Sequence, residues 1–253
     1  MTQPVEISAD LPVAVRSGLE RLCQELSAAL GDRLVSVVLY GGLAKNEYDS
    51  PLASNVNVLV VLKEADVETL ERLRLPVEEG VRAMRLAAMV ATEQDLGRST
   101  DVFPTKFRDM QRHHRVLWGK EVLSGLSISR DHLRLRCEQE IKNLLLRMRG
   151  FYVLRAEYPE ALERTLNRAV SSLLNSLAVL LELKTGQAPS GKTQTVEAVA
   201  QLGLDARSLR DALALKRGVL KPDAAGLKQL YDAFLRTVRQ AAEMVDALGG
   251  ANV

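Results

Sequence analysis

The chain has 253 residues, of which 47% are hydrophobic and 26% are charged, and its formal net charge is +2. This composition excludes an intrinsically disordered chain and predicts a soluble protein with a sizeable core. Aromatic residues make up only 4%, which speaks against a base-stacking surface for single-stranded nucleic acid. The small net charge gives no indication of nucleic acid as a partner.

The sequence predicts a cytoplasmic location without a membrane partner. Cys23 and Cys137 are far apart and show no CxxC spacing, so we expect free thiols in a reducing compartment. The first ten residues lack a basic segment followed by an apolar one, the pattern of a secretory signal. No apolar run approaches the ~20 residues that span a bilayer.

The first third of the chain predicts a helix and two strands. Residues 11–30 carry apolar side chains at helical spacing, and Gly31 follows as a stop signal. Residues 34–39 form a short apolar run that ends before Gly41-Gly42, which indicates a buried strand. A polar segment then leads to a second predicted strand, residues 55–62.

Further elements follow in the same half. Residues 66–85 are helical in character and interrupted by Pro76, and residues 86–91 predict a third strand. Thr92 with Asp95 three residues later is typical of a helix N-cap. Pro104 is suited to the first turn of a helix, and residues 115–118 predict a short last strand.

From residue 129 onward the pattern is purely helical. Apolar stripes predict helices over residues 129–155, 159–185, 193–202, 206–216 and 223–248. The fold class expected is therefore α+β: a small mixed sheet flanked by helices, followed by an all-α bundle. The boundary falls near residues 124–129, which gives two domains, 1–125 and 126–253.

The second predicted strand begins with two polar residues, Asn55 and Asn57, although asparagine is depleted in strands. Two residues apart, their side chains share one face, opposite Val56, Val58 and Val60. This layout resembles the nucleotidyltransferase superfamily of DNA polymerase β and the aminoglycoside nucleotidyltransferases. Its signature is an apolar strand, Gly-Gly or Gly-Ser opening a helix, and Ser-Asp-x-Asp on the next strand.

The resemblance covers roughly residues 10 to 125. Gly41-Gly42 matches the first block, and Ser54-Asn55-Val56-Asn57 stands where Ser-Asp-x-Asp is expected. Asp101-Val-Phe-Pro104, followed by Val116-Leu117-Trp118-Gly119, is similar to blocks in one bacterial subgroup of these proteins. The resemblance implies a nucleotide or phosphate site at Gly41, Gly42, Lys45, Ser54, Asn55 and Asn57.

The same comparison implies that the chemistry of the family is impaired. In active members the two aspartates hold divalent metals, and both are amides here. Active relatives usually carry a third carboxylate on a neighbouring strand, and residues 86–91 contain none. Neutral amide oxygens bind Mg²⁺ much more weakly than carboxylates do. We therefore assign no catalytic residue and no metal ligand.

The leading hypothesis is an impaired nucleotidyltransferase-like protein that acts as a binding or regulatory module, with a nucleoside triphosphate as its only candidate ligand. The alternative is an active metal-dependent nucleotidyltransferase acting on a small molecule or a protein, with Glu47 or Asp49 as displaced acids and Mg²⁺ as cofactor. A third hypothesis is a purely structural interaction module. The leucine stripes of the two longest predicted helices also leave room for a homodimer.

Gly186-Gln-Ala-Pro-Ser-Gly-Lys192-Thr193 fits the phosphate-loop pattern GxxxxGK[ST]. That motif requires a buried strand before it, whereas residues 166–184 have helical periodicity. We therefore interpret it as a polar connection between helices.

Two other sets of residues are weaker signals. His113 and His114 are adjacent and would diverge on a helix, and His132 is isolated, so we expect surface or supporting positions for all three. Tyr152 and Tyr158 lie among Arg147, Arg149 and Arg155. For this basic helix end we expect a solvated face.

Overall fold

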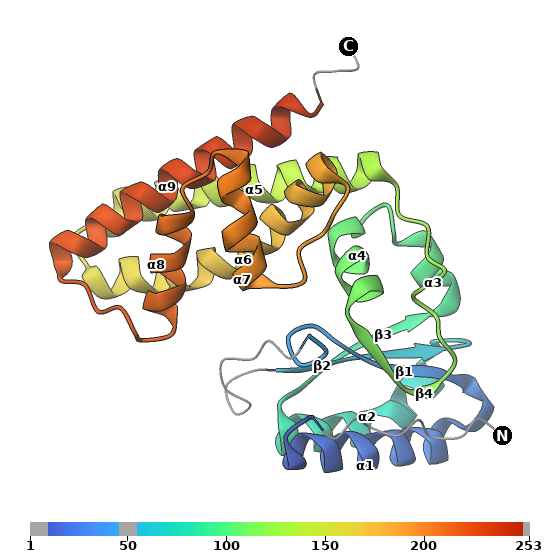
Figure 1. Cartoon of the computed structure of the whole chain (residues 1–253). Helices are drawn as coiled ribbons and strands as arrows, with labels where there is room; N and C mark the ends of the chain where they lie inside the picture. The colour runs from blue at the N-terminus through green and yellow to red at the C-terminus, as the bar shows by residue number, and fades with distance from the viewer. Residues whose placement is uncertain (1–9, 46–54, 250–253) are drawn as a thin grey trace. The chain divides into compact units, whose positions relative to one another are not determined.

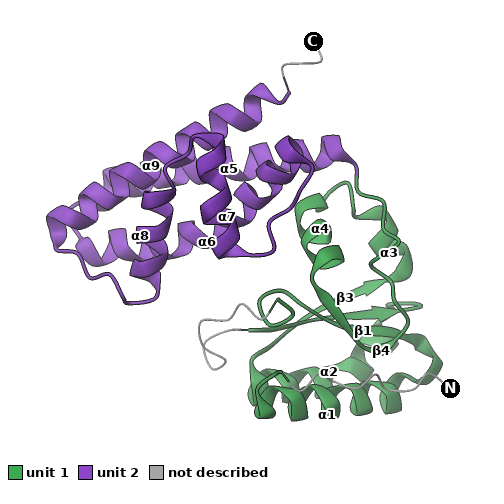
Figure 2. Cartoon of the chain, in the orientation of Figure 1, with its two compact units in different colours: residues 1–128 green, residues 129–253 purple. Residues whose placement is uncertain are grey.

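The computed structural model describes residues 10–45 and 55–249. Ser54, Glu47 and Asp49, named above, lie outside these residues. The chain divides into two compact units, residues 1–128 and 129–253 (Figure 2). The first holds a mixed sheet with flanking helices and the second is all-helical, so the predicted α+β fold class is confirmed. Among the described helices, none has the length and apolar character that crossing a membrane requires.

The sheet of the first unit has four strands in the order β3-β2-β1-β4. They are β1 (Leu34–Tyr40), β2 (Val56–Leu62), β3 (Leu86–Thr92) and β4 (His114–Gly119). Strand β1 pairs antiparallel with β2 and β4, and β2 pairs parallel with β3. The first two predicted strands are thus neighbours in one sheet.

Helices cover both faces of this sheet (Figure 1). Helices α1 (Val13–Leu30) and α2 (Val67–Met84) pack on the face that carries Val56, Val58 and Val60. On the opposite face, Leu59 and Val61 contact Phe107 and other residues of α3 (Glu93–Arg98) and α4 (Pro104–Arg112). Both faces of β1 and β2 are therefore buried, which explains their nearly continuous apolar sequences.

Local signals account for most helix ends in the first unit. Thr92 and Asp95 form a capping box at α3, as their spacing predicts, and Pro104 occupies the first turn of α4. The expected interruption at Pro76 is wrong, because α2 runs through it without a break. Pro76 lies on the buried face with Leu73, so packing offsets the backbone hydrogen bond that proline removes.

The second unit is built on three long helices, α5 (Arg130–Arg155), α6 (Pro159–Thr185) and α9 (Ala224–Ala247). The short helices α7 (Lys192–Ala198) and α8 (Ala206–Lys216) and the 3₁₀ turn Val199–Leu202 complete it. A second 3₁₀ turn, Gly31–Arg33, belongs to the first unit. One hydrophobic core joins α5, α6, α8 and α9. Tyr231 in this core is 1% exposed, and its hydroxyl donates to Met148 O at 2.7 Å. Both cysteines are free and buried.

Candidate functional site

The candidate site lies where β1 ends and β2 begins. In the register of the sheet, Tyr40 pairs with Asn57 on one side and with His114 on the other. Asn57 in turn pairs with Ala87 of β3. A row of four side-chain positions, one from each strand, therefore crosses the sheet at this end.

Gly41 and Gly42 follow β1 directly and turn the chain. The backbone N–H of Lys45 donates to Gly41 O at 3.2 Å, which closes one helical turn, and Leu43 anchors it with 1% exposure. Gly41 has φ +80°, and a Cβ atom there would come 2.9 Å from Asn57 Nδ2. Glycine is thus favoured by conformation, and any larger residue would also have to displace the end of the Asn57 side chain. Any continuation of this turn into the predicted helix lies outside the described residues.

The two asparagines of the sequence motif differ in environment. Asn57 is half-buried in β2, and its side chain lies on the face opposite Val56 and Val58, as alternation predicts. Asn55 precedes the strand and is exposed. Asn57 Nδ2 makes a long contact of 3.5 Å with the backbone oxygen of Asn55. The amide nitrogen of Asn57 therefore faces backbone, at a position where an aspartate would offer a second anionic oxygen.

Two lysines bring positive charge to this end of the sheet. Lys45 is mostly buried, with a side chain 15% exposed, and its Nζ lies 2.5 Å from Asp109 Oδ1 of α4. Lys106, one turn earlier on α4, has its Nζ 5.9 Å from the ring centroid of Tyr40, a cation–π distance. Burial raises the pKa of the Tyr40 hydroxyl. The charge of Lys45 is thus already balanced by one carboxylate, while its ammonium has further N–H donors to offer.

His114 occupies the outer end of the row. Its Nδ1 lies 2.8 Å from Met110 O and its Nε2 lies 2.6 Å from Glu121 Oε2. An oxygen atom thus faces each ring nitrogen and holds the ring from both sides. Burial acts to raise the pKa of Glu121, but hydrogen bonds from His114 and from the backbone N–H groups of Leu123 and Ser124 outweigh it, and the pKa is lowered. His114 begins β4 and does not lie on a helix, and Met110 and Glu121 hold its ring in place.

The donors around this row do not fit a pair of divalent metal ions. Within residues 10–45 and 55–249, no group of three or more histidine, cysteine or acidic side chains is placed to hold a metal. Ala87, the register partner of Asn57 on β3, is apolar and offers no metal ligand. The nearby acids Asp109 and Glu121 are bound to Lys45 and His114. Hard divalent cations prefer several anionic oxygens, and the described residues do not supply them.

The phosphate-loop pattern at residues 186–193 has no strand before it. Helix α6 runs to Thr185, Gly186 ends it with φ +75°, and α7 begins at Lys192. Within the connection, Ser190 N donates to Gln194 Oε1 at 2.5 Å. The prediction of a polar link between two helices is confirmed, and the strand–loop–helix context of a phosphate loop is absent from this described segment.

Comparison with known proteins finds a similar three-dimensional structure but no similar sequence. No protein-family model matches the chain, and no curated protein matches its sequence. Among solved structures, it is similar to spectinomycin adenyltransferase AAD(9) from Enterococcus faecialis, solved with ATP and spectinomycin. The TM-score is 0.55 at 12% sequence identity, and the match covers 88% of this chain and 98% of the other. The chain therefore has a nucleotidyltransferase-like fold.

Proposed function

We propose that this protein binds a nucleotide through its phosphates at the Gly41 turn and serves as a binding or regulatory module, without transferring nucleotidyl groups. The observation that carries the proposal is the position of Asn57. It lies against Gly41 at the end of the sheet, with Ala87 beside it. A nucleotidyltransferase-like fold is thus combined with neutral side chains at this end of the sheet.

Phosphate binding is supported by the turn and by the lysines. Glycine lets a phosphate approach the backbone closely, and backbone N–H groups in such a turn point toward an anion. Lys45 and Lys106 add two ammonium groups beside the same end of the sheet. The similar adenyltransferase was solved with ATP, which favours a nucleoside triphosphate over other organic phosphates as ligand. Gly42, Ser54 and Asn55 complete the proposed site.

Loss of transfer follows from charge. Phosphoryl transfer with two metals depends on carboxylates that hold the metals and neutralise the developing charge. Asn55 and Asn57 supply neutral oxygens, and the described strand β3 carries no acid at all. Without a carboxylate near the attacking hydroxyl, a general base worth about 10²- to 10⁴-fold in rate is also missing.

The alternative function is an active nucleotidyltransferase that uses relocated acids. Glu47 and Asp49 follow the Gly41 turn in sequence and precede β2. Both lie outside the described residues. The similar solved protein is an adenyltransferase with a small-molecule substrate in its title. Metal-dependent labelling of an acceptor by the unmutated chain would favour this alternative.

Calorimetric titration with ATP, with EDTA and then with Mg²⁺, tests the proposed binding. We expect saturable binding that Lys45→Met and Lys106→Met each weaken by about 10- to 100-fold, the usual effect of losing a charged hydrogen bond. Lys221→Met, an exposed lysine of the second unit, removes the same charge and should leave affinity unchanged. The absence of ATP binding by the folded chain would contradict the proposal and favour the purely structural module.

A further inference from the structure

A second candidate site lies wholly within the helical unit, between the C-terminal half of α5 and the N-terminal half of α6. It is a pocket of about 510 Å³, within the usual range for small-molecule sites. The residues that line it come from these two helices alone: Leu144, Arg147, Met148, Phe151, Arg155, Ala161, Arg164, Thr165, Arg168, Ala169 and Ser172.

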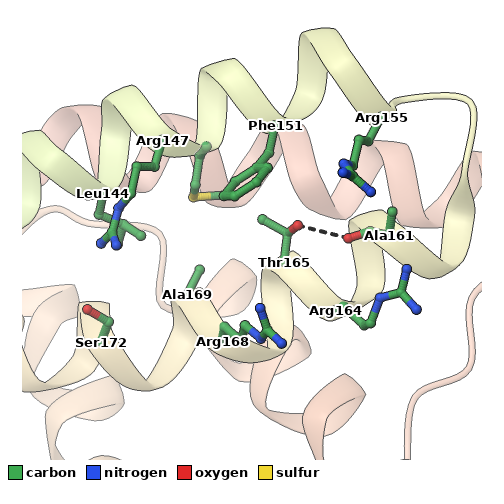
Figure 3. A pocket seen from close by; sticks show the side chains of 11 residues that line it. Leu144, Arg147, Phe151, Arg155, Ala161, Arg164, Thr165, Arg168, Ala169 and Ser172 are labelled. Atoms are coloured by element: carbon green, nitrogen blue, oxygen red, sulfur yellow. Dashed lines mark hydrogen bonds between the residues drawn. The ribbon is translucent and has the colours of Figure 1, made fainter.

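Four arginines and no acidic residue line the pocket. Arg155 and Arg164 extend from opposite helices at one end, and Arg147 reaches down from α5 on the side of Ser172 (Figure 3). Arg147 Nε donates to Asn143 O at 3.3 Å. Within the described part of the chain, no carboxylate forms an ion pair with Arg155, Arg164 or Arg168. Positive charge is thus concentrated at the end of the pocket formed by Arg155, Arg164 and Arg168, where no carboxylate pairs with it in the described residues. At the other end, Glu140 lines the neighbouring hollow that shares Arg147 and Ser172.

The floor of the pocket is apolar. Met148 and Leu144 of α5 and Ala161 of α6 are buried, with 1%, 5% and 6% exposure. Phe151 stands between the arginines of α5 and is 44% exposed, so one part of its ring is open to a ligand. A pocket with cationic walls and an apolar floor fits a ligand that has an anionic end and an apolar body.

We propose that this pocket binds a small organic phosphate, with its phosphate between the arginines of the two helices and its apolar body on Phe151 and Met148. A phosphate is favoured over a carboxylate because it carries up to two charges and three acceptor oxygens, and can therefore engage several guanidinium groups at once. Guanidinium groups bind such oxygens in a paired, planar geometry. This inference does not depend on the nucleotide site at Gly41.

The basic face that the sequence predicts consists of Arg147, Arg149 and Arg155 of α5 alone. Such a face could simply be hydrated by solvent. The structure adds Arg164 and Arg168 from α6 on the other side of the same hollow. Repulsion between these arginines in the folded unit opposes folding. An anion that bridges them should therefore stabilise the folded unit. This stabilisation separates a ligand pocket from a merely solvated surface.

The test is calorimetric titration of the full chain with 1-naphthyl phosphate, inorganic phosphate and 1-naphthol. We expect 1-naphthyl phosphate to bind at one site and more tightly than either fragment. It should also raise the melting temperature progressively, with the logarithm of its concentration once that exceeds Kd. Arg164→Gln with Arg168→Gln should weaken binding by about 100-fold. Phe151→Ala should remove the advantage of 1-naphthyl phosphate over inorganic phosphate.

Arg149→Gln is the matched control, because Arg149 is an exposed arginine of α5 outside the pocket. Lys45→Met separates this site from the proposed nucleotide site, and neither control should change the affinity for 1-naphthyl phosphate. Equal losses in Arg149→Gln and in the pocket variants would overturn the proposal, as would no saturable binding by the folded chain. Arginine-dependent binding to phosphatidylserine vesicles without binding of 1-naphthyl phosphate would also overturn it, in favour of a membrane surface.

Discussion

Gly41 and Asn57 lie against each other across two strands: a Cβ atom at Gly41 would lie 2.9 Å from Asn57 Nδ2, although the two residues are far apart in sequence. Tyr40, the residue before Gly41, pairs with Asn57 in the sheet register. The turn after β1 and the polar start of β2 are therefore one structural unit. A substitution at either residue should therefore change the effect of a substitution at the other on the free energy of unfolding.

Gly41→Ala should lower the free energy of unfolding by about 1–2 kcal/mol, because alanine is strained at φ +80°. The loss should be smaller in an Asn57→Ala background, where the close contact is removed and only the backbone strain remains. Gly97→Ala in α3, where nothing lies within 4 Å of the added methyl, is the control and should not destabilise. Denaturant unfolding measures all four variants. Equal costs of Gly41→Ala in both backgrounds would show that the two residues are not coupled.

The His114–Glu121 pair should make stability depend on acid pH. The pKa of Glu121 is lowered from its ordinary value of 4.5, so its contribution is present above that value and is lost as the pH falls through the folded-state pKa. Glu121→Gln should therefore reduce the drop in melting temperature between about pH 6 and pH 3. Glu64→Gln, at an exposed position, is the control. If the melting temperature of Glu121→Gln falls as much as that of the unmutated chain, Glu121 does not contribute to the pH dependence of stability.

Lys192→Ala should leave ATP affinity unchanged. Lys192 opens α7 after a helix–loop–helix connection, so its loop lacks the strand that positions a phosphate loop. Calorimetric titration with ATP compares the affinity of Lys192→Ala with that of Lys45→Met and of the unmutated chain. A large loss of affinity in a folded Lys192→Ala protein would instead assign nucleotide binding to residues 186–193.

A homodimer through α5 remains a prediction. Leu146, Val153 and Leu154 of this helix are 63%, 83% and 75% exposed. Their spacing places Leu146 and Val153 on one face, with Leu154 at its edge toward Phe151. Covering this apolar face with a second copy would bury it. Light scattering should give the mass of two chains, and Val153→Glu with Leu154→Glu the mass of one. Val219→Glu, at a 79% exposed position, should change nothing. A single-chain mass for the unmutated protein at all concentrations would remove the dimer.

The strands could be predicted from sequence because their signals are local. Residues 34–39 and 56–62 are runs of β-branched and apolar residues bounded by glycine and polar segments, and both are strands. The capping box of Thr92 and Asp95 is equally local. The predicted interruption at Pro76 was wrong because α2 packs against α1 and the sheet, and this packing stabilises the helix through the proline. No local sequence pattern reveals that packing.

The contacts that define both candidate sites could not be predicted, since they join distant parts of the chain. Lys45 meets Asp109 across 64 residues, and nothing in either segment indicates the other. In the same way, the spacing of Arg147 and Arg155 places them on one side of α5. Only the packing of α6 brings Arg164 and Arg168 opposite them. Tertiary packing, not helical periodicity, creates the arginine pocket.

Restoring the aspartates should not restore transfer. Asn55→Asp with Asn57→Asp rebuilds the part of a metal site that β2 contributes, so we expect Mg²⁺-dependent nucleotide affinity to increase. Ala87 and the rest of β3 still provide no carboxylate, and turnover should stay near background because the general base is missing. Efficient turnover by this double variant would show that the third acid is supplied from elsewhere.

The most direct measurement is incubation of the unmutated chain with each labelled nucleoside triphosphate, Mg²⁺ or Mn²⁺ and candidate acceptors, including the protein itself. An active nucleotidyltransferase serves as the positive control. We expect bound nucleotide, but labelling of every acceptor only at the level of the reaction without protein. Robust metal-dependent labelling by the unmutated chain would contradict this expectation and identify Glu47 or Asp49 as the first residues to substitute.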